Sequence, residues 1–83
     1  MGEITASERI VLELIAIQGK RMTTEEIQIL IAQKEPEIEE VEPLLQSLQS
    51  HHFLRSEEGI TTTWHITMRG LLASGIGVNS GWP

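Results

Sequence analysis

The chain has 83 residues, of which 40% are hydrophobic and 22% are charged, a composition typical of one small globular domain. It has no cysteine, which excludes a disulfide framework and a thiolate metal site and favours a reducing, cytoplasmic compartment. Twelve Glu, no Asp and six Lys plus Arg give a net charge of −6, which disfavours DNA because nonspecific affinity for phosphate comes mostly from cations.

The first element is predicted to be a helix that begins at a capping box. Thr5 and Glu8 stand three residues apart, so each side chain can bond a backbone amide of the other residue. Gly19 is suited to end the helix in a left-handed conformation, beside the cations Lys20 and Arg21. The apolar face between these ends consists of Ile10, Val11, Leu14, Ile15 and Ile17.

A second helix repeats this start signal at Thr23 and Glu26. Met22 before the cap and Ile27 after it have the spacing of a hydrophobic staple, which fixes how the chain enters the helix. Pro36 is predicted to end the helix, because the residue before a proline avoids the helical region. The apolar stripe of this helix is formed by Ile27, Leu30 and Ile31.

A third helix is predicted over residues 39–50, with its start between residues 39 and 42. Pro43 fits this start, since a proline is tolerated in the first helical turn, where its missing amide has no helical partner to lose. The inward face of this helix consists of Val41, Leu44, Leu45 and Leu48.

After the third helix, the spacing of apolar residues changes to the alternation that is typical of β-strands. Residues 53–56 and 60–66 are predicted to be strands, joined by a turn at residues 57–59. A short apolar turn or helix follows at residues 71–73, so the domain spans residues 1–73 and residues 74–83 form a tail rich in Gly and Ser. The core-facing side of the second strand is predicted to carry Ile60, Thr62, Trp64 and Ile66.

The segment after the second strand, Ile66-Thr67-Met68-Arg69-Gly70, breaks the alternation. We expect Thr67 to cap the amides of the turn that follows, and Gly70 to give the chain the freedom to turn back onto the helices. The motif therefore indicates structure and not catalysis.

Three helices followed by a two-stranded hairpin make a mostly α domain with the plan of a winged helix. The segment TTEEIQILIAQKEPEIEEVEPLLQSLQSHHFLRSEEGITTTWHITMRG resembles the winged helices of MarR-like and ArsR-like regulators. The resemblance covers about residues 7 to 73 and implies a three-helix winged-helix bundle of order α-α-α-β-β. The positions that carry it are Leu45, Leu48, Phe53, Leu54, Trp64, Ile66, Thr67 and Gly70.

In DNA-binding winged helices the third helix enters the major groove, and the wing adds basic contacts to phosphates. Here both regions carry carboxylates, which phosphates would repel. We interpret the Glu run as either a solvated helix start or an acidic docking surface. We interpret Trp82 as either an aromatic anchor in the tail or a residue that folds back over the chain's own apolar surface. The candidate partner-binding residues are Glu37, Glu39, Glu40, Glu42, Glu57, Glu58 and Trp82.

Two other hypotheses use different residues. A DNA-binding transcription regulator would use the scattered cations Lys20, Arg21, Lys34, Arg55 and Arg69, which we otherwise interpret as solubility and helix-end charges. A metal-responsive regulator would use the three histidines, but adjacent histidines usually point apart and no His-x-x-x-His pair or cysteine completes a ligand set. We therefore expect no metal and no cofactor. The histidines are His51, His52 and His65.

Enzyme activity has little support in the sequence. The chain has no Asp, Cys or Tyr, and no Ser or Thr stands in a recognisable nucleophile motif. No apolar run approaches the roughly 20 residues of a membrane helix, and we expect no signal peptide. The sequence thus predicts a non-catalytic, acidic winged-helix module that binds a protein partner or associates with itself. A second candidate interface lies on the first helix at Ile4, Val11 and Ile17.

Overall fold

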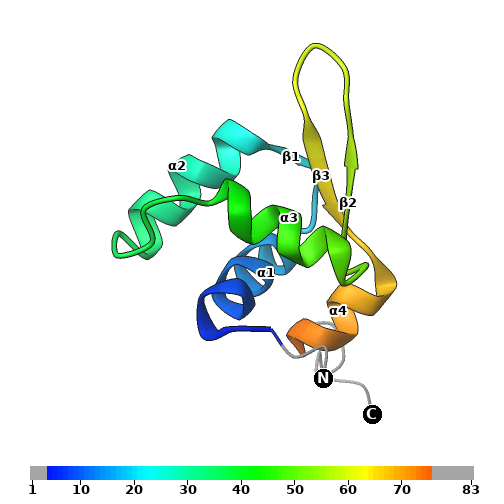
Figure 1. Cartoon of the computed structure of the whole chain (residues 1–83), viewed down its shortest axis with the longest axis horizontal. Helices are drawn as coiled ribbons and strands as arrows, with labels where there is room; N and C mark the ends of the chain where they lie inside the picture. The colour runs from blue at the N-terminus through cyan, green and yellow to red at the C-terminus, as the bar shows by residue number, and fades with distance from the viewer. Residues whose placement is uncertain (1–3, 76–83) are drawn as a thin grey trace.

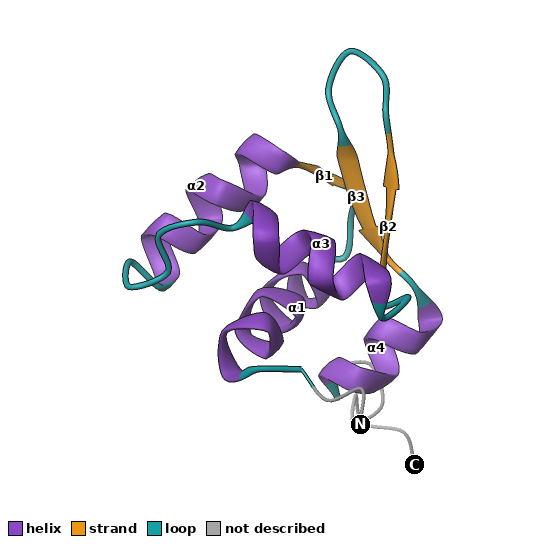
Figure 2. Ribbon diagram, in the orientation of Figure 1, coloured by secondary structure: helices purple, strands orange, loops and turns teal. Residues whose placement is uncertain are grey.

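A computed structural model describes residues 4–75 and shows a mostly helical chain with a small antiparallel sheet (Figures 1 and 2). The three predicted helices, the predicted hairpin and the short helix predicted after it are all present, and one short strand is added to them. Within residues 4–75 no helix has both the length and the apolar character needed to cross a membrane. The elements in chain order are α1 (Ala6–Gln18), β1 (Met22–Thr23), α2 (Thr24–Lys34), α3 (Glu42–Ser50), β2 (Leu54–Glu57), β3 (Thr63–Ile66) and α4 (Met68–Ser74).

Local capping defines where α1 and α2 begin and end. The amide of Glu8 donates to Thr5 Oγ1 at 3.2 Å, and the amide of Thr5 donates to Glu8 Oε1 at 2.8 Å. The same reciprocal pair forms at the start of α2, as predicted. Gly19 ends α1 with a φ of +67°, and α2 ends at Lys34, two residues before Pro36. These four predictions are confirmed because each depends on neighbouring residues alone.

α3 begins at Glu42, the last residue of the range predicted for its start. It ends in a motif that was not predicted from the sequence. His52 adopts a φ of +66°, which is unusual for a residue with a side chain. Its amide donates to the carbonyl of Gln49, and the amide of Phe53 donates to the carbonyl of Leu48, both at 2.9 Å. This is the hydrogen-bond pattern of a Schellman cap, and it turns the chain from α3 into β2.

The sheet has the order β1-β3-β2 with all pairs antiparallel. Trp64 lies at its centre, opposite Met22 of β1 and Ser56 of β2. The prediction that Ile60 faces the core is wrong, because β3 begins only at Thr63 and Ile60 lies fully exposed in the loop of the hairpin. β1 was not predicted, since two residues show no alternation by themselves.

The core lies where α1, α2, α3 and the sheet meet. Val11, which we expected at a surface interface, is fully buried, and Leu12, missing from the predicted apolar face, is buried beside it. Ile17 is 61% exposed, so only the end of α1 leaves an apolar side chain in solvent. The core residues are Val11, Leu12, Ile15, Met22, Ile27, Ile31, Val41, Leu45, Leu48, Leu54 and Trp64.

Hydrogen bonds of Thr67 connect the start of α4 to the loop between α3 and β2. Thr67 caps α4 as predicted, since its hydroxyl oxygen accepts the amide of Gly70 at 3.0 Å. The same hydroxyl donates to the carbonyl of His52 at 2.7 Å, and the backbone amide of Thr67 donates to the carbonyl of Phe53 at 3.1 Å. The role predicted for Gly70 is wrong: it lies inside α4, without a positive φ, where a Cβ would collide with the Phe53 carbonyl.

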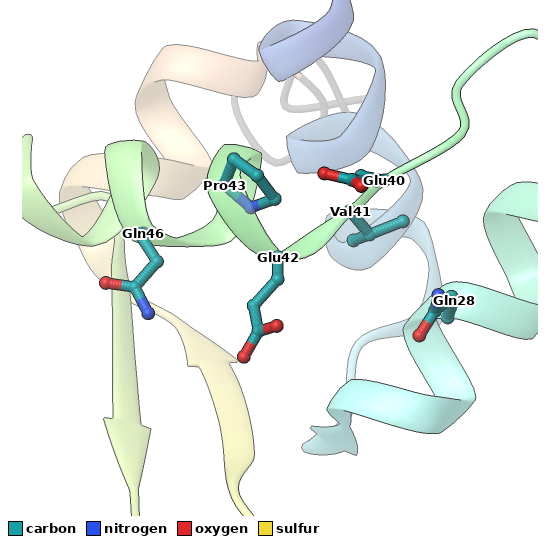
Figure 3. Close-up of a pocket in the computed structure, with 6 residues that line it drawn as sticks. All are labelled: Gln28, Glu40, Val41, Glu42, Pro43 and Gln46. Carbon is teal, nitrogen blue, oxygen red and sulfur yellow. The ribbon is translucent and has the colours of Figure 1, made fainter.

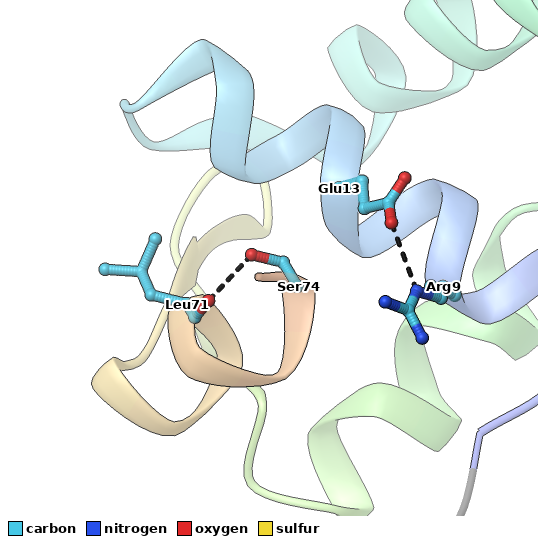
Figure 4. Close-up of polar contacts among 4 residues, drawn as sticks. All are labelled: Arg9, Glu13, Leu71 and Ser74. Carbon is cyan, nitrogen blue, oxygen red and sulfur yellow. Dashed lines mark hydrogen bonds and ion pairs between the residues drawn. The ribbon is translucent and has the colours of Figure 1, made fainter. Parts of the chain in front are cut away.

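α4 also packs beside α1 (Figure 4). Near its end the buried hydroxyl of Ser74 donates to the carbonyl of Leu71 at 2.8 Å, so this polar group is satisfied inside the helix. On α1, Arg9 and Glu13 form an ion pair of 3.1 Å one turn apart. That pair is exposed and contributes at most about 0.5 kcal/mol. α4 is therefore held by its packing beside α1 and by the hydrogen bonds of Thr67.

A buried carboxylate joins the start of α1 to α3. Glu8 is only 7% exposed. Burial raises the pKa of Glu8, but hydrogen bonds from the Ser47 hydroxyl and from Thr5, together with the nearby His51, outweigh it and hold this pKa below its ordinary value. The charged form of Glu8 is thus stabilised by the fold.

The substitution Gly70→Ala should destabilise the domain. The new methyl group would overlap the Phe53 carbonyl and lie 2.7 Å from Ile66 Cγ1, so we expect a loss of about 1–3 kcal/mol in the free energy of unfolding. Urea denaturation measures it. Gly59→Ala is the matched control, because a Cβ there meets only the Thr61 carbonyl at 3.8 Å. Equal stabilities of the two variants would refute the close approach.

The substitution Glu8→Gln should reduce both stability and its dependence on pH. A depressed folded-state pKa stabilises the protein above the unfolded-state pKa, and this stabilisation is lost as the pH falls through the folded-state value. We expect a loss of about 1.5 kcal/mol at neutral pH that shrinks in acid, measured by urea denaturation at a series of pH values. Glu13→Gln, on the same helix, should leave the slope unchanged. A wild-type slope in Glu8→Gln would contradict the role of this carboxylate.

Candidate interaction surface

The outward face of α3 is polar and borders two hollows. Leu45 and Leu48 are buried, so the helical period turns Glu42, Gln46 and Gln49 away from the core. Glu42 and Gln46 are exposed and Gln49 is half-buried. The side chains that α3 offers to a ligand are therefore a carboxylate and two amides.

A groove of about 440 Å³ separates α2 from the start of α3 (Figure 3). We call it the α2–α3 groove. Gln28 faces it from α2, while Glu42 and Gln46 project from the same side of α3. The whole lining is Gln28, Glu40, Val41, Glu42, Pro43 and Gln46. Two carboxylates and two amides give it a negative, hydrogen-bonding character.

A second hollow of about 250 Å³, the hairpin hollow, lies between α3, the start of α2 and the β2–β3 hairpin. Its walls are fixed by two hydrogen bonds. The indole N–H of Trp64 donates to Thr24 Oγ1 at 2.8 Å, and the amide of Gln49 donates to Ser56 Oγ at 2.8 Å. The lining is Thr24, Glu42, Gln46, Gln49, Ser56, Glu58, Thr62 and Trp64. Since it shares Glu42 and Gln46 with the α2–α3 groove, the two form one continuous surface.

The structure brings some of the predicted acidic residues together and separates others. Glu40 and Glu42 line the α2–α3 groove, and Glu42 and Glu58 line the hairpin hollow. Glu57 forms an exposed ion pair of 3.2 Å with Arg21. Trp82 lies outside the described residues. Glu37 and Glu39 are exposed on the connection between α2 and α3 but line neither hollow.

The predicted cations are exposed on different elements. Lys20 and Arg21 follow α1, Lys34 ends α2, Arg55 lies on β2 and Arg69 lies on α4. None of these residues lines the α2–α3 groove or the hairpin hollow. The α2–α3 groove and the hairpin hollow therefore present negative charge, whereas Arg55 lines a separate hollow of about 390 Å³ that shares Gln49 and Ser56 with the hairpin hollow.

The histidines have local structural contacts. His51 Nδ1 lies 2.9 Å from the carbonyl of Ser47, its ring lies 5.7 Å from that of Phe53, and His65 stands opposite Arg55 in the sheet. Within residues 4–75 no group of three acidic or histidine side chains is placed to hold a metal ion.

The amides on this surface, Gln28, Gln46 and Gln49, were not predicted as site residues. The sequence did contain a signal for two of them, since Glu42, Gln46 and Gln49 follow the helical period on the side opposite Leu45 and Leu48. Gln28 carried no such signal, because its place in the groove depends on how α2 packs beside α3.

Comparison with known proteins adds no relative: no family model, no curated protein and no solved structure matches this chain.

The substitution Thr24→Ala should loosen the hairpin from α2. It removes the acceptor of the Trp64 indole N–H, and we expect a loss of about 1 kcal/mol in the free energy of unfolding and faster hydrogen exchange of that N–H. Denaturation and NMR exchange measure the two effects. Thr61→Ala, at an exposed position in the hairpin loop, is the control. Unchanged indole exchange in Thr24→Ala would show that this bond does not hold the hairpin.

Proposed function

We propose that this chain is a small, non-catalytic winged-helix domain that binds a protein partner through the negative surface of α3. Three helices followed by an antiparallel hairpin and a short helix support the winged-helix assignment, and β1 is an addition to the predicted plan. The position of the hairpin beside α3, across the hairpin hollow, fits the relation of a wing to a recognition helix.

The main support for the proposal is the negative charge of the α2–α3 groove and the hairpin hollow. Glu40, Glu42 and Glu58 line them, and the residues that line them include no Lys or Arg. In a DNA complex these carboxylates would come within a Debye length, about 8–10 Å, of backbone phosphates and would repel them. A protein surface that carries Lys or Arg meets the same groove with attraction and with hydrogen-bond donors for the Gln side chains.

The alternative function is a DNA-binding regulator, and one observation favours it. Gln46 and Gln49 project from α3, and such amides can pair with adenine in the major groove. Gln49, however, is engaged by Ser56 at 2.8 Å, and Glu42 stands one turn before Gln46. The balance of these contacts favours a protein partner.

Reversal of the groove charges tests the proposal. The double variant Glu40→Lys, Glu42→Lys should lose the proteins that the wild type captures from a nuclease-treated extract of its own cells. Both residues are exposed, and a Lys at Glu42, the first position of α3, costs only about 0.3–1 kcal/mol, so circular dichroism should show a folded chain.

The matched control is Glu37→Lys, Glu39→Lys, which makes the same charge change on the same connection outside the groove. This control should retain capture. Loss of the same proteins from both double variants would mean that overall charge, and not the groove, governs binding. If the wild type captures proteins from an untreated extract and loses them after nuclease treatment, the result favours the DNA alternative.

A further inference from the structure

An apolar shelf on α2 adjoins the α2–α3 groove. Its lining, Glu25, Gln28, Ile29 and Ala32, encloses a shallow and mainly apolar hollow of about 320 Å³ on the exposed side of the helix. Ile29 is 61% exposed, because it points away from Ile27 and Ile31, which are fully buried. Gln28 lines both the shelf and the α2–α3 groove, so the two surfaces are continuous.

α4 presents a surface of matching character. Met68 and Leu72, one turn apart on the same face of the helix, are 71% and 60% exposed. Arg69 is the only charged residue of α4 and is exposed one turn before Leu72. α4 is therefore a short helix with an apolar stripe and a single positive charge.

We propose that α4 of one molecule docks on the α2 shelf and α2–α3 groove of a second copy. Met68 and Leu72 would cover Ile29, and Arg69 would meet the carboxylates of Glu40 or Glu42. The burial of exposed apolar surface drives the contact, and opposite charge sets its orientation. This inference rests on the proposed function, since it names the partner that the negative surface takes.

The other exposed apolar side chains fit the shelf less well. Ile60 follows Glu57 and Glu58 in the chain, so a hairpin tip placed on the shelf would bring carboxylates toward Glu25. Ile17 is the one large apolar residue of α1 that is exposed in the described chain, whereas α4 offers two that are aligned. Both its charge and its exposed apolar residues therefore make α4 the element that fits the shelf best.

The placement of the two surfaces determines what kind of assembly forms. α2 and α4 lie at opposite ends of the molecule, with α1 and α3 between them (Figure 1). A contact between two different surfaces is heterologous, and repetition of it produces a ring or an open chain of molecules. The expected product is thus a concentration-dependent series of oligomers.

Sedimentation velocity over a range of concentrations tests this arrangement. The wild type should sediment above its monomer mass of 9.3 kDa as concentration rises, and Ile29→Ser or Leu72→Ser should each weaken association about tenfold or more. Ile17→Ser is the matched control, because Ile17 has the same 61% exposure as Ile29. A monomeric wild type at millimolar concentration, or association lost in Ile17→Ser and kept in Ile29→Ser, would overturn the proposal.

A mixing experiment tests the pairing of charges. Arg69→Glu, and separately the double variant Glu40→Lys, Glu42→Lys, should each be monomeric, because like charges then meet at every contact. An equal mixture of the two should associate, since opposite charges meet again between unlike molecules. A mixture that stays monomeric would overturn the pairing.

The two proposals fail in different ways. A monomeric wild type that still captures proteins through Glu40 and Glu42 would remove self-association and keep the protein-binding function. If the wild type forms oligomers, and substitution of Glu40 and Glu42 changes neither the oligomerisation nor the capture of other proteins, both proposals are contradicted.

Discussion

The hydrogen bond from the Trp64 indole to Thr24 is the contact on which the candidate surface depends. Trp64 is 3% exposed and lies opposite Met22 and Ser56, so one side chain joins the three strands and the first turn of α2. This hydrogen bond and the one between Gln49 and Ser56 join the elements that line the hairpin hollow. The core beneath fixes α3 itself, through Leu45 and Leu48.

The surface built on this frame has a charge opposite to that of a DNA-binding surface. A helix displayed beside a hairpin is suited to DNA in shape, but shape does not determine function. Glu40, Glu42 and Glu58 place negative charge where a DNA-binding domain places cations. In the proposed function, the same carboxylates, next to the apolar Ile29 on α2, would contact a protein surface that combines positive and apolar groups.

Sequence reasoning succeeded where a structural feature depends on neighbouring residues. Both capping boxes, the end of α2 before Pro36 and the cap at Thr67 follow from the chemistry of three or four consecutive positions. It failed where distant segments meet. β1 exists only because Met22 pairs with Trp64, and Gly70 is required only because Phe53 lies against α4. Glu40, Glu42 and Glu58 were predicted from their positions at the start of the third helix and at the tip of the hairpin, whereas the place of Gln28 in the groove depends on the packing of α2 beside α3.

Fluorescence anisotropy of a labelled mixed-sequence DNA duplex, titrated with the protein at low salt, tests the negative surface most directly. Low salt is the condition most permissive for nonspecific binding. We expect no rise in anisotropy for the wild type up to tens of micromolar protein, and a rise for Glu40→Lys, Glu42→Lys, in which the groove has the opposite charge. A rise for the wild type that weakens steeply with added salt would contradict a protein-docking face and would favour the DNA-binding alternative.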